Sequence, residues 1–285
     1  MNLVPRVMPK VTFSLDRSSQ VDLLEREFLK LPQVNCPVVH RFGPGIYIRE
    51  VTVPAGSYAI GHAQRFEHMN VFLKGRVTVI NDDGSKTELV APMTFVGKPG
   101  RKIGYVHEDM VWQNIYATTE TDIATLEATY LDKSDGWQAH HASIPLLAHD
   151  ADRSDYADVL EEFGFTEAIA RAQSEDESDQ TPFPHGAYKV AVMASQIQGD
   201  GLFATADIMP FEIIAPARIG GKRTPAGRYT NHSKSPNARM IMRDNGDIDL
   251  VCTAMNGIKG CAGGNLGEEI TIDYREALRL QIKEN

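Results

Sequence analysis

The stretch that decides the fold runs from RYTNHS (Arg228–Ser233) through SPNA (Ser235–Ala238) to GEEITIDY (Gly267–Tyr274). A further segment, GDGLFA (Gly199–Ala204), lies upstream. A lone pair of glycines marks any tight turn and carries little information. Three short motifs in a fixed order are more specific, so we start from them.

These motifs resemble the SET domain of protein lysine methyltransferases, over roughly the last third of the chain. The resemblance implies a small β domain that binds S-adenosyl-L-methionine. The residues that match its cofactor-binding positions are Gly199, Asp200, Gly201, Leu202, Asn231 and His232. An asparagine amide both donates and accepts hydrogen bonds, which suits a zwitterionic ligand. The alternative is that Asn231 and Asn237 only close turns beside Pro236.

Tyr274 matches the catalytic tyrosine of that family, and Tyr229 would be a second wall of a channel for the acceptor lysine. Methyl transfer needs a neutral amine, whereas the ordinary pKa of lysine is about 10.4. A narrow apolar channel would lower that pKa. The Tyr274 hydroxyl would then align the amine. The alternative is a packed strand tyrosine bonded to backbone.

The sequence departs from the family in its substrate half. Pro210–Glu212 stands where an acid-glycine-glutamate turn is usual, so the glycine is missing. Only about thirty residues separate Gly201 from Asn231, and no cysteine-rich cluster follows Tyr274. The cofactor half is therefore better supported than the substrate half. The tail, Arg275–Asn285, is expected to be a short helix.

Composition sets further bounds on the 285-residue chain, which is long enough for about two domains. The net charge of -9 argues against binding to nucleic acid or to an anionic membrane surface, and it permits attraction to a basic peptide. Neither a signal peptide nor a membrane-spanning segment is expected. Cys36, Cys252 and Cys261 fit no zinc spacing, so reduced thiols in a cytoplasmic setting are expected. For a viral chain, that setting would be the host cytoplasm or the virion.

The N-terminal region is expected to start with an extended arm, Met1–Asp16, and a helix over Val21–Leu31 capped by Ser18 or Ser19. From Cys36 to Tyr130, period-two alternation and glycine or proline turns predict a sandwich or barrel of short strands. The expected strands include Ile46–Val53, two strands around Gly75 within Val71–Ile80, Ala91–Val96, Val111–Tyr116 and Ala124–Tyr130.

The order Gly61-His62, Glu67-His68, Gly75, Pro99-Gly100 and His107 resembles a degenerate cupin, a small double-sheeted jelly roll. The resemblance implies a divalent metal bound by His62, His68 and His107. His62 is offset by one place, which in a strand turns its side chain to the other face. The alternative is that these histidines make ordinary contacts and that the barrel is a scaffold or an oligomerisation surface.

The predicted fold class is therefore mainly β, with a cupin-like jelly-roll barrel followed by a small SET-like domain. The expected divisions are residues 1–35 for the arm and helix, 36–133 for the barrel, 134–184 for a linker with short helices, and 185–285 for the SET-like domain. Within the linker, Tyr156–Phe163 and Thr166–Gln173 are expected helices, and the acidic Ser174–Gln180 is expected to be mobile.

Three functions stay open at this point. The first is an S-adenosyl-L-methionine-dependent transferase that methylates a lysine of a partner protein or peptide. The second is a non-enzymatic, oligomeric structural or assembly protein, such as a virion component, that uses both folds as scaffolds. The third is a metal-dependent cupin enzyme.

Overall fold

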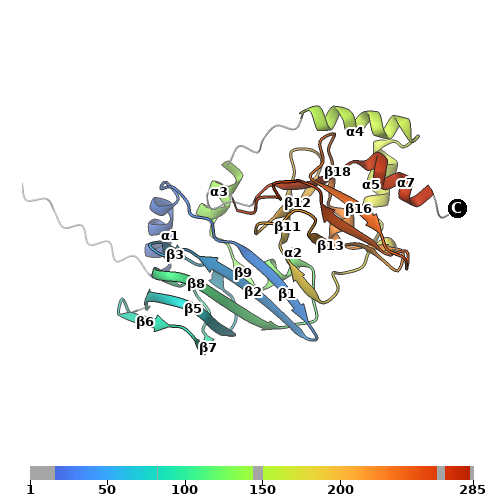
Figure 1. Cartoon of the computed structure of the whole chain (residues 1–285). Helices are drawn as coiled ribbons and strands as arrows, with labels where there is room; N and C mark the ends of the chain where they lie inside the picture. Colours follow the sequence, from blue (N-terminus) through green and yellow to red (C-terminus); the bar gives the residue numbers. More distant parts are fainter. Residues whose placement is uncertain (1–16, 82, 144–149, 262–266, 283–285) are drawn as a thin grey trace, which may run out of the picture.

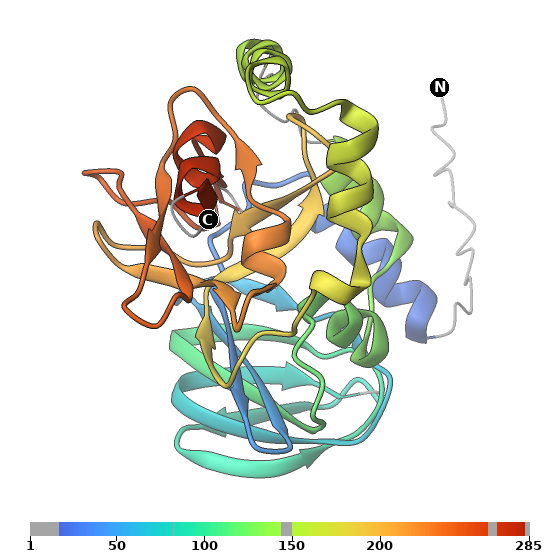
Figure 2. The ribbon, with the colours of Figure 1, turned by 90° about the vertical axis from the view of Figure 1, so that its right-hand side faces the viewer.

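The computed structural model describes residues 17–81, 83–143, 150–261 and 267–282, and these form a mainly β protein. Two β-rich parts lie next to each other, and helices from the middle of the chain cover one side of the second part (Figures 1 and 2). The arm predicted over Met1–Asp16 lies outside the described residues. Helix α1 (Arg17–Phe28) starts earlier than predicted, so Ser18 and Ser19 lie within it instead of capping it.

The first β part is one large antiparallel sheet with the strand order β10-β1-β2-β8-β5-β6, with β3 on β8 and β7 on β5. Its strands are β1 (Val38–Gly43), β2 (Ile46–Val53), β3 (Tyr58–Ile60), β5 (His68–Ile80), β6 (Lys86–Val90), β7 (Met93–Gly97) and β8 (Ile103–Ala117). Alternate residues face inward, as a half-buried sheet requires, and Phe72, Val106 and Trp112 form a cluster there.

Strand β5 is continuous, which corrects the prediction of two strands around Gly75. The pairing of β5 with β8 shifts register on both sides of Lys74 and at Arg76. Gly75 has φ of +99°, and a Cβ there would lie 2.6 Å from the Asp109 carbonyl oxygen. Glycine thus permits a bulge, which bends the strand without ending it.

The predicted strand over Ala124–Tyr130 is instead helix α2 (Ile123–Tyr130). The Asp122 side chain caps it by accepting a hydrogen bond of 2.8 Å from the Thr125 N–H. Ile123 and Leu126 are buried on one face of this helix. The threonines and tyrosine of the segment favour strands, but the cap and the packing outweigh that preference.

The predicted linker is mostly helical, with α3 (Asp135–Ser143), α4 (Asp150–Glu162), α5 (Glu167–Glu175) and a 3₁₀ turn at Glu177–Asp179. Gly164 follows the last residues of α4 and has a left-handed φ of +71°, as is common after a helix. Thr166 then caps the N-terminus of α5. The acidic Ser174–Gln180 was expected to be mobile. It is held instead, because Arg223 donates to Asp179 at 2.7 Å and Arg228 donates to Gln180 at 2.6 Å.

The strands that flank this linker on either side both pair with strands of the first β part. Strand β9 (Leu131–Asp132) pairs with β4 (Ala63–Gln64), and β10 (Gly186–Tyr188) pairs with β1. At Lys189, between β10 and the strand that begins at Val190, the chain passes from one sheet to another. The expected boundary at residue 185 falls just before a strand of the first sheet.

The second β part has two sheets, with the orders β11-β12-β18-β15 and β14-β13-β17-β16. Its elements are β11 (Val190–Ala194), β12 (Asp200–Ala204), β13 (Ile213–Ile219), β14 (Lys222–Arg223), α6 (Pro225–Arg228), β15 (Asn231–His232), β16 (Ala238–Met242), β17 (Ile248–Cys252), β18 (Glu269–Ile272) and α7 (Tyr274–Ile282). Among its described strand pairs, β15 with β18 is parallel.

One apolar core joins the two β parts. Phe42, Tyr47 and Tyr116 of the first part belong to the same buried cluster as Leu202, Leu250 and Ile270 of the second, with Leu126 of α2. Full burial of such a side chain stabilises the fold by about 1.5–3 kcal/mol. The two parts are therefore held together by hydrophobic packing.

Phe211 stands in the turn where the sequence lacks an expected glycine. Its φ is +64°, in the left-handed region that glycine adopts freely, and its side chain is 69% exposed. This conformation costs a residue with a Cβ about 1–2 kcal/mol. The turn keeps the shape that glycine would give it, at the expense of local strain.

We expect Phe211→Gly to raise the free energy of unfolding by about 0.5–1 kcal/mol, the left-handed cost less the extra chain entropy of glycine. Urea unfolding measures the change. Phe66→Gly is the control, because Phe66 is also exposed, at 53%, but has no positive φ. A Phe211→Gly variant that is as destabilised as the control would contradict this account of the turn.

Candidate functional site

Three distant motifs meet at one cavity of about 660 Å³. Gly199 and Asp200 come from the turn before β12, Tyr229 and Asn231 from the end of α6 and from β15, and Tyr274 from the start of α7. We call this space the motif cavity. Of the residues predicted to bind the cofactor, Gly201, Leu202 and His232 do not line it.

Strand pairing brings these motifs together. Strand β18 lies between β12 and β15, with Phe203 opposite Glu269 and Asn231 opposite Thr271. Residues 66 and 40 positions apart in the sequence are thereby fixed as neighbours. Tyr274 follows β18 directly, so its position is set by the same strand.

The Asn231 amide is anchored within the protein. Its Nδ2 donates to the carbonyl oxygens of Gln198 and Asp200, both at 3.1 Å, and to Glu269 Oε1 at 2.8 Å. These bonds hold the turn around Gly199 against β15. Within the described part of the chain, no donor lies within hydrogen-bonding distance of Asn231 Oδ1, so the acceptor half of the amide stays available.

Gly201 and Leu202 have structural places. A Cβ at Gly201 would overlap the Glu269 carboxylate, which Ser195 also holds through hydrogen bonds of 2.8 and 3.0 Å. The glycine therefore makes room for a side chain, although the sequence predicted close approach to a ligand. Leu202 is fully buried in the shared core.

Tyr274 is fixed at its backbone and at its hydroxyl. The hydroxyl donates to the Thr230 carbonyl oxygen at 3.0 Å, and the Tyr274 N–H donates to His232 Nδ1 at 3.2 Å. Tyr156 of α4 packs edge-on against the ring, with centroids 5.9 Å apart. Burial, followed by the nearby Tyr156 and Glu269, raises the pKa of the Tyr274 phenol, so it stays protonated at neutral pH.

Tyr229 also faces the motif cavity, as its prediction as a channel wall requires. The Arg228 guanidinium lies over its ring, 4.9 Å from the centroid. Burial raises the pKa of its phenol. Thus both aromatic residues that the sequence predicted line the same space as neutral phenols.

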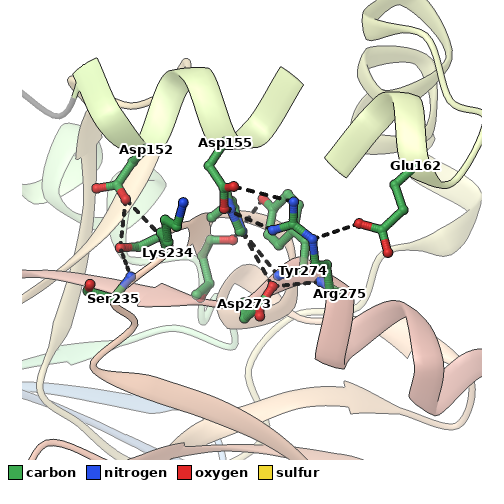
Figure 3. A network of polar contacts seen from close by, with 11 residues as sticks. Asp152, Asp155, Glu162, Lys234, Ser235, Asp273, Tyr274 and Arg275 are labelled. Atoms are coloured by element: carbon green, nitrogen blue, oxygen red, sulfur yellow. Dashed lines mark hydrogen bonds and ion pairs between the residues drawn. The ribbon is translucent and has the colours of Figure 1, made fainter. Parts of the chain in front are cut away.

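His232 does not line the cavity but contacts Asp155 of α4, which belongs to the polar network with Tyr274 and Arg275 in Figure 3. Its Nδ1 accepts from the Tyr274 N–H, so its Nε2 carries the proton and donates to Asp155 Oδ2 at 2.8 Å. Arg275 donates to both oxygens of Asp155, at 2.8 and 3.3 Å, and to Glu162 at 2.7 Å. The His232 imidazole thus positions Asp155 and the Tyr274 N–H, and the residue does not line the motif cavity.

A second contact fastens the same helix to the segment after the histidine (Figure 3). Asp152 accepts from the Ser233 hydroxyl at 2.9 Å and from the Lys234 N–H at 3.0 Å. The network also includes the Ser235 N–H, which donates to Ser233 Oγ at 3.0 Å. Helix α4 is thus attached at two points to the chain around Asn231.

The linker helices supply a wall of the motif cavity that sequence analysis did not predict. Tyr156, Leu160, Phe165 and Arg171 contribute to it from α4, α5 and their connection. The sequence marked this segment only as two short helices. Asp155 and Tyr156 stand side by side within it, but their partners lie more than a hundred residues away at Arg275 and Tyr274.

The predicted metal site does not assemble. His62 packs edge-on against Trp137, with centroids 4.8 Å apart, and His68 Nδ1 bonds the Phe66 carbonyl at 3.0 Å. His107 Nε2 lies 2.8 Å from Oγ1 of Thr78 on the neighbouring strand. Among the described side chains, no three His, Cys, Asp or Glu gather as ligands for one ion. These histidines do not fit a divalent metal.

No protein-family model matches the chain, and no curated protein does. Solved structures with a similar part include a cupin domain from Bordetella pertussis, at 13% identity and a TM-score of 0.26, covering 31% of this chain and 98% of that one. An RmlC-like cupin from Methanocaldococcus jannaschii, described as a double-stranded β-helix, has 12% identity and a TM-score of 0.25, covering 30% and 84%.

A transcriptional regulator of the HTH_3 family from Vibrio cholerae matches at 21% identity and a TM-score of 0.25, and the chain spans about half of it, with 30% and 52% covered. Matches at such scores carry no argument about this chain. The SET-domain resemblance gains no support from them and rests on the sequence motifs. In the parts of the chain described here, no helix is long and apolar enough to cross a membrane.

The Asp155 network predicts a pH dependence. Hydrogen bonds from Arg275, and then from His232, lower the pKa of the Asp155 carboxyl from 3.8 to about 2. A lowered pKa stabilises the fold above the ordinary value, and that contribution is lost as pH falls toward 2. We expect Asp155→Asn to lower the free energy of unfolding by about 1–2 kcal/mol at neutral pH. The difference from the parent protein should shrink between pH 4 and pH 2.

Denaturant unfolding at several pH values measures this effect. Asp158→Asn is the matched control, because Asp158 is an exposed carboxylate on the same helix. A constant difference across that pH range, or an equal loss in the control, would show that Asp155 does not act through its charge.

Proposed function

We propose that the second β part binds S-adenosyl-L-methionine in the motif cavity and transfers its methyl group to a lysine amine of a partner protein or peptide. The observation that supports this proposal is that Gly199, Asn231 and Tyr274, from three separate motifs, line one cavity of about 660 Å³. Such a volume is typical of small-molecule sites. The SET-domain resemblance suggests the chemistry, and the shared cavity supports the proposal.

Several groups in the motif cavity suit this cofactor. Asn231 Oδ1 can accept a hydrogen bond from an ammonium group, since its Nδ2 is already used. Gly199 has nothing within 4 Å of where a Cβ would stand, so its backbone is open to a ligand. Asp200 adds an exposed carboxylate beside it. When bound, the cofactor would supply an electrophilic methyl group on a sulfonium.

Tyr274 would align the acceptor. Its hydroxyl hydrogen is given to Thr230, so the lone pairs of the oxygen remain free to accept from an amine N–H. Tyr156, Leu160 and Phe165 provide apolar surface that favours the neutral amine. The amine nitrogen takes the methyl group as the carbon–sulfur bond breaks, and the proton of the resulting ammonium leaves to solvent.

We expect Tyr274→Phe to lower the rate of methyl transfer at least about 100-fold, because the aligning oxygen is lost. Its affinity for S-adenosylhomocysteine, measured by calorimetry, should stay within a few-fold of the parent. Tyr188→Phe is a matched control, since Tyr188 also donates to a backbone carbonyl, at 2.9 Å, but lies outside the motif cavity. Transfer to lysine-containing peptides is measured with labelled cofactor.

If calorimetry detects no binding heat with S-adenosyl-L-methionine or with S-adenosylhomocysteine, the proposal is overturned. Equal loss of transfer in the two variants would show that Tyr274 is needed for the fold and not for alignment.

A second candidate is a non-enzymatic, oligomeric assembly protein. One observation favours it: the Glu269 carboxylate occupies both the space beside Gly201 and the donor side of Asn231, so two expected ligand contacts are used internally. On this candidate, light scattering of the purified protein gives the mass of a closed multimer, and calorimetry gives no cofactor heat. A monomer that binds the cofactor would exclude it.

A further inference from the structure

A second cavity, of about 420 Å³, is lined mainly by the first β part and partly by the second. We call it the inner cavity. Strands β2, β5 and β8 and helices α1, α2 and α3 contribute to its wall, and Val192, Thr205 and Cys261 line it from the second part. It shares no lining residue with the motif cavity. Its size again suits a small organic molecule.

Arg49 lines the inner cavity with a guanidinium whose hydrogen-bond donors are only partly used. Its side chain is only 16% exposed, and its one described hydrogen bond is from Nε to Glu127 at 3.4 Å. Within the described residues, its two terminal nitrogens have no acceptor. A buried guanidinium normally uses this fork on a carboxylate or phosphate, so the vacancy points to a ligand.

His68 and Asn70 bring two buried polar atoms without hydrogen-bond partners. His68 is 6% exposed and Asn70 is fully buried, and both line the inner cavity. Asn70 Oδ1 accepts from Trp112 and Asn114, each at 2.8 Å, which fixes the orientation of the amide. Its Nδ2 and His68 Nε2 lack partners. Leaving such atoms unsatisfied is costly.

The tautomer of His68 follows from its neighbour. Because Nδ1 lies 3.0 Å from the Phe66 carbonyl oxygen, Nδ1 must carry the proton and Nε2 is an acceptor. The pair therefore offers one acceptor, at His68, and one donor, at Asn70. A hydroxyl group satisfies both, since it donates and accepts at once.

The charge of the lining is positive by one. Among the described residues of the wall, the charged side chains are Glu25, Arg49, Lys102, Glu127 and Lys133. Glu25 is also paired with Arg101, outside the lining, and Lys133 donates to Glu127 at 2.8 Å. Burial lowers the pKa of His62 to about 3, so this histidine adds no charge at neutral pH. One excess cation matches a carboxylate better than a phosphate monoester, which carries nearly two charges.

We propose that the inner cavity binds a small monocarboxylate with an apolar body and a hydroxyl group. Arg49 would hold the carboxylate through its terminal nitrogens, with Lys133 nearby. Val77, Met110 and Trp112 would pack against the body, and His68 with Asn70 would bind the hydroxyl. This site needs no metal and is independent of methyl transfer.

The test is calorimetry of the full-length protein with 4-hydroxyphenylacetate as the probe. We expect binding of one molecule per chain. The matched neutral amide, 4-hydroxyphenylacetamide, should bind at least about 10-fold more weakly, because it cannot form the charged fork with Arg49. Phenylacetate, which lacks the hydroxyl, should bind several-fold more weakly. Equal affinity for acid and amide, or no binding of the acid at millimolar concentration, would overturn the proposal.

Two variants locate the site. Arg49→Gln should weaken binding of the probe about 10-fold or more. Arg76→Gln removes the same charge from a residue outside the inner cavity that pairs with Glu88 and Glu108, and it should leave binding unchanged. An equal loss in both variants would overturn the assignment to Arg49.

Asn70→Asp is a second variant. It tests whether the probe binds in the inner cavity even if Arg49→Gln does not fold. It keeps the acceptor for Trp112 and Asn114 but replaces the free donor with a charge that repels the probe. Unchanged binding in this variant would rule out the inner cavity as the site. Thermal unfolding of each variant checks that the fold is intact.

Discussion

The carboxylate of Asp155 is the contact on which the motif cavity depends. It lies on α4 and accepts from His232 and Arg275, the residues next to Asn231 and Tyr274. One acidic side chain thus joins a linker helix to the two motifs that define the site. Without it, His232 would lose the partner that sets its tautomer, and the Tyr274 N–H would lose a fixed acceptor.

The same contact explains why the helical segment belongs to the site. A short connection between Gly201 and Asn231 leaves little chain to build a wall for a ligand. Helices α4 and α5 supply that wall from before the domain, with Tyr156 packed against Tyr274. The wall that this short connection does not provide is therefore built from residues upstream.

Sequence alone located the motifs, the expected helices of the linker and most strands of the first part. It singled out Asn231 and Tyr274, which the pairing of β15 with β18 brings to one cavity. It did not predict Asp155, since a lone aspartate in a helix has no pattern that reveals a distant partner. It also missed helix α2, whose strand-favouring residues are overruled by the cap at Asp122. The reason for Gly201 emerged only with Glu269 in place.

The apolar core that runs through both β parts has a practical consequence. A fragment that ends in the linker, before β10, would leave β1 with an open hydrogen-bonding edge. It would also uncover the apolar side chains that meet Leu202, Leu250 and Ile270. Open edges and bare apolar faces are the features that make polypeptides aggregate. Isolated halves of this chain should therefore be insoluble or need each other's presence, and each would report poorly on the chemistry of the whole.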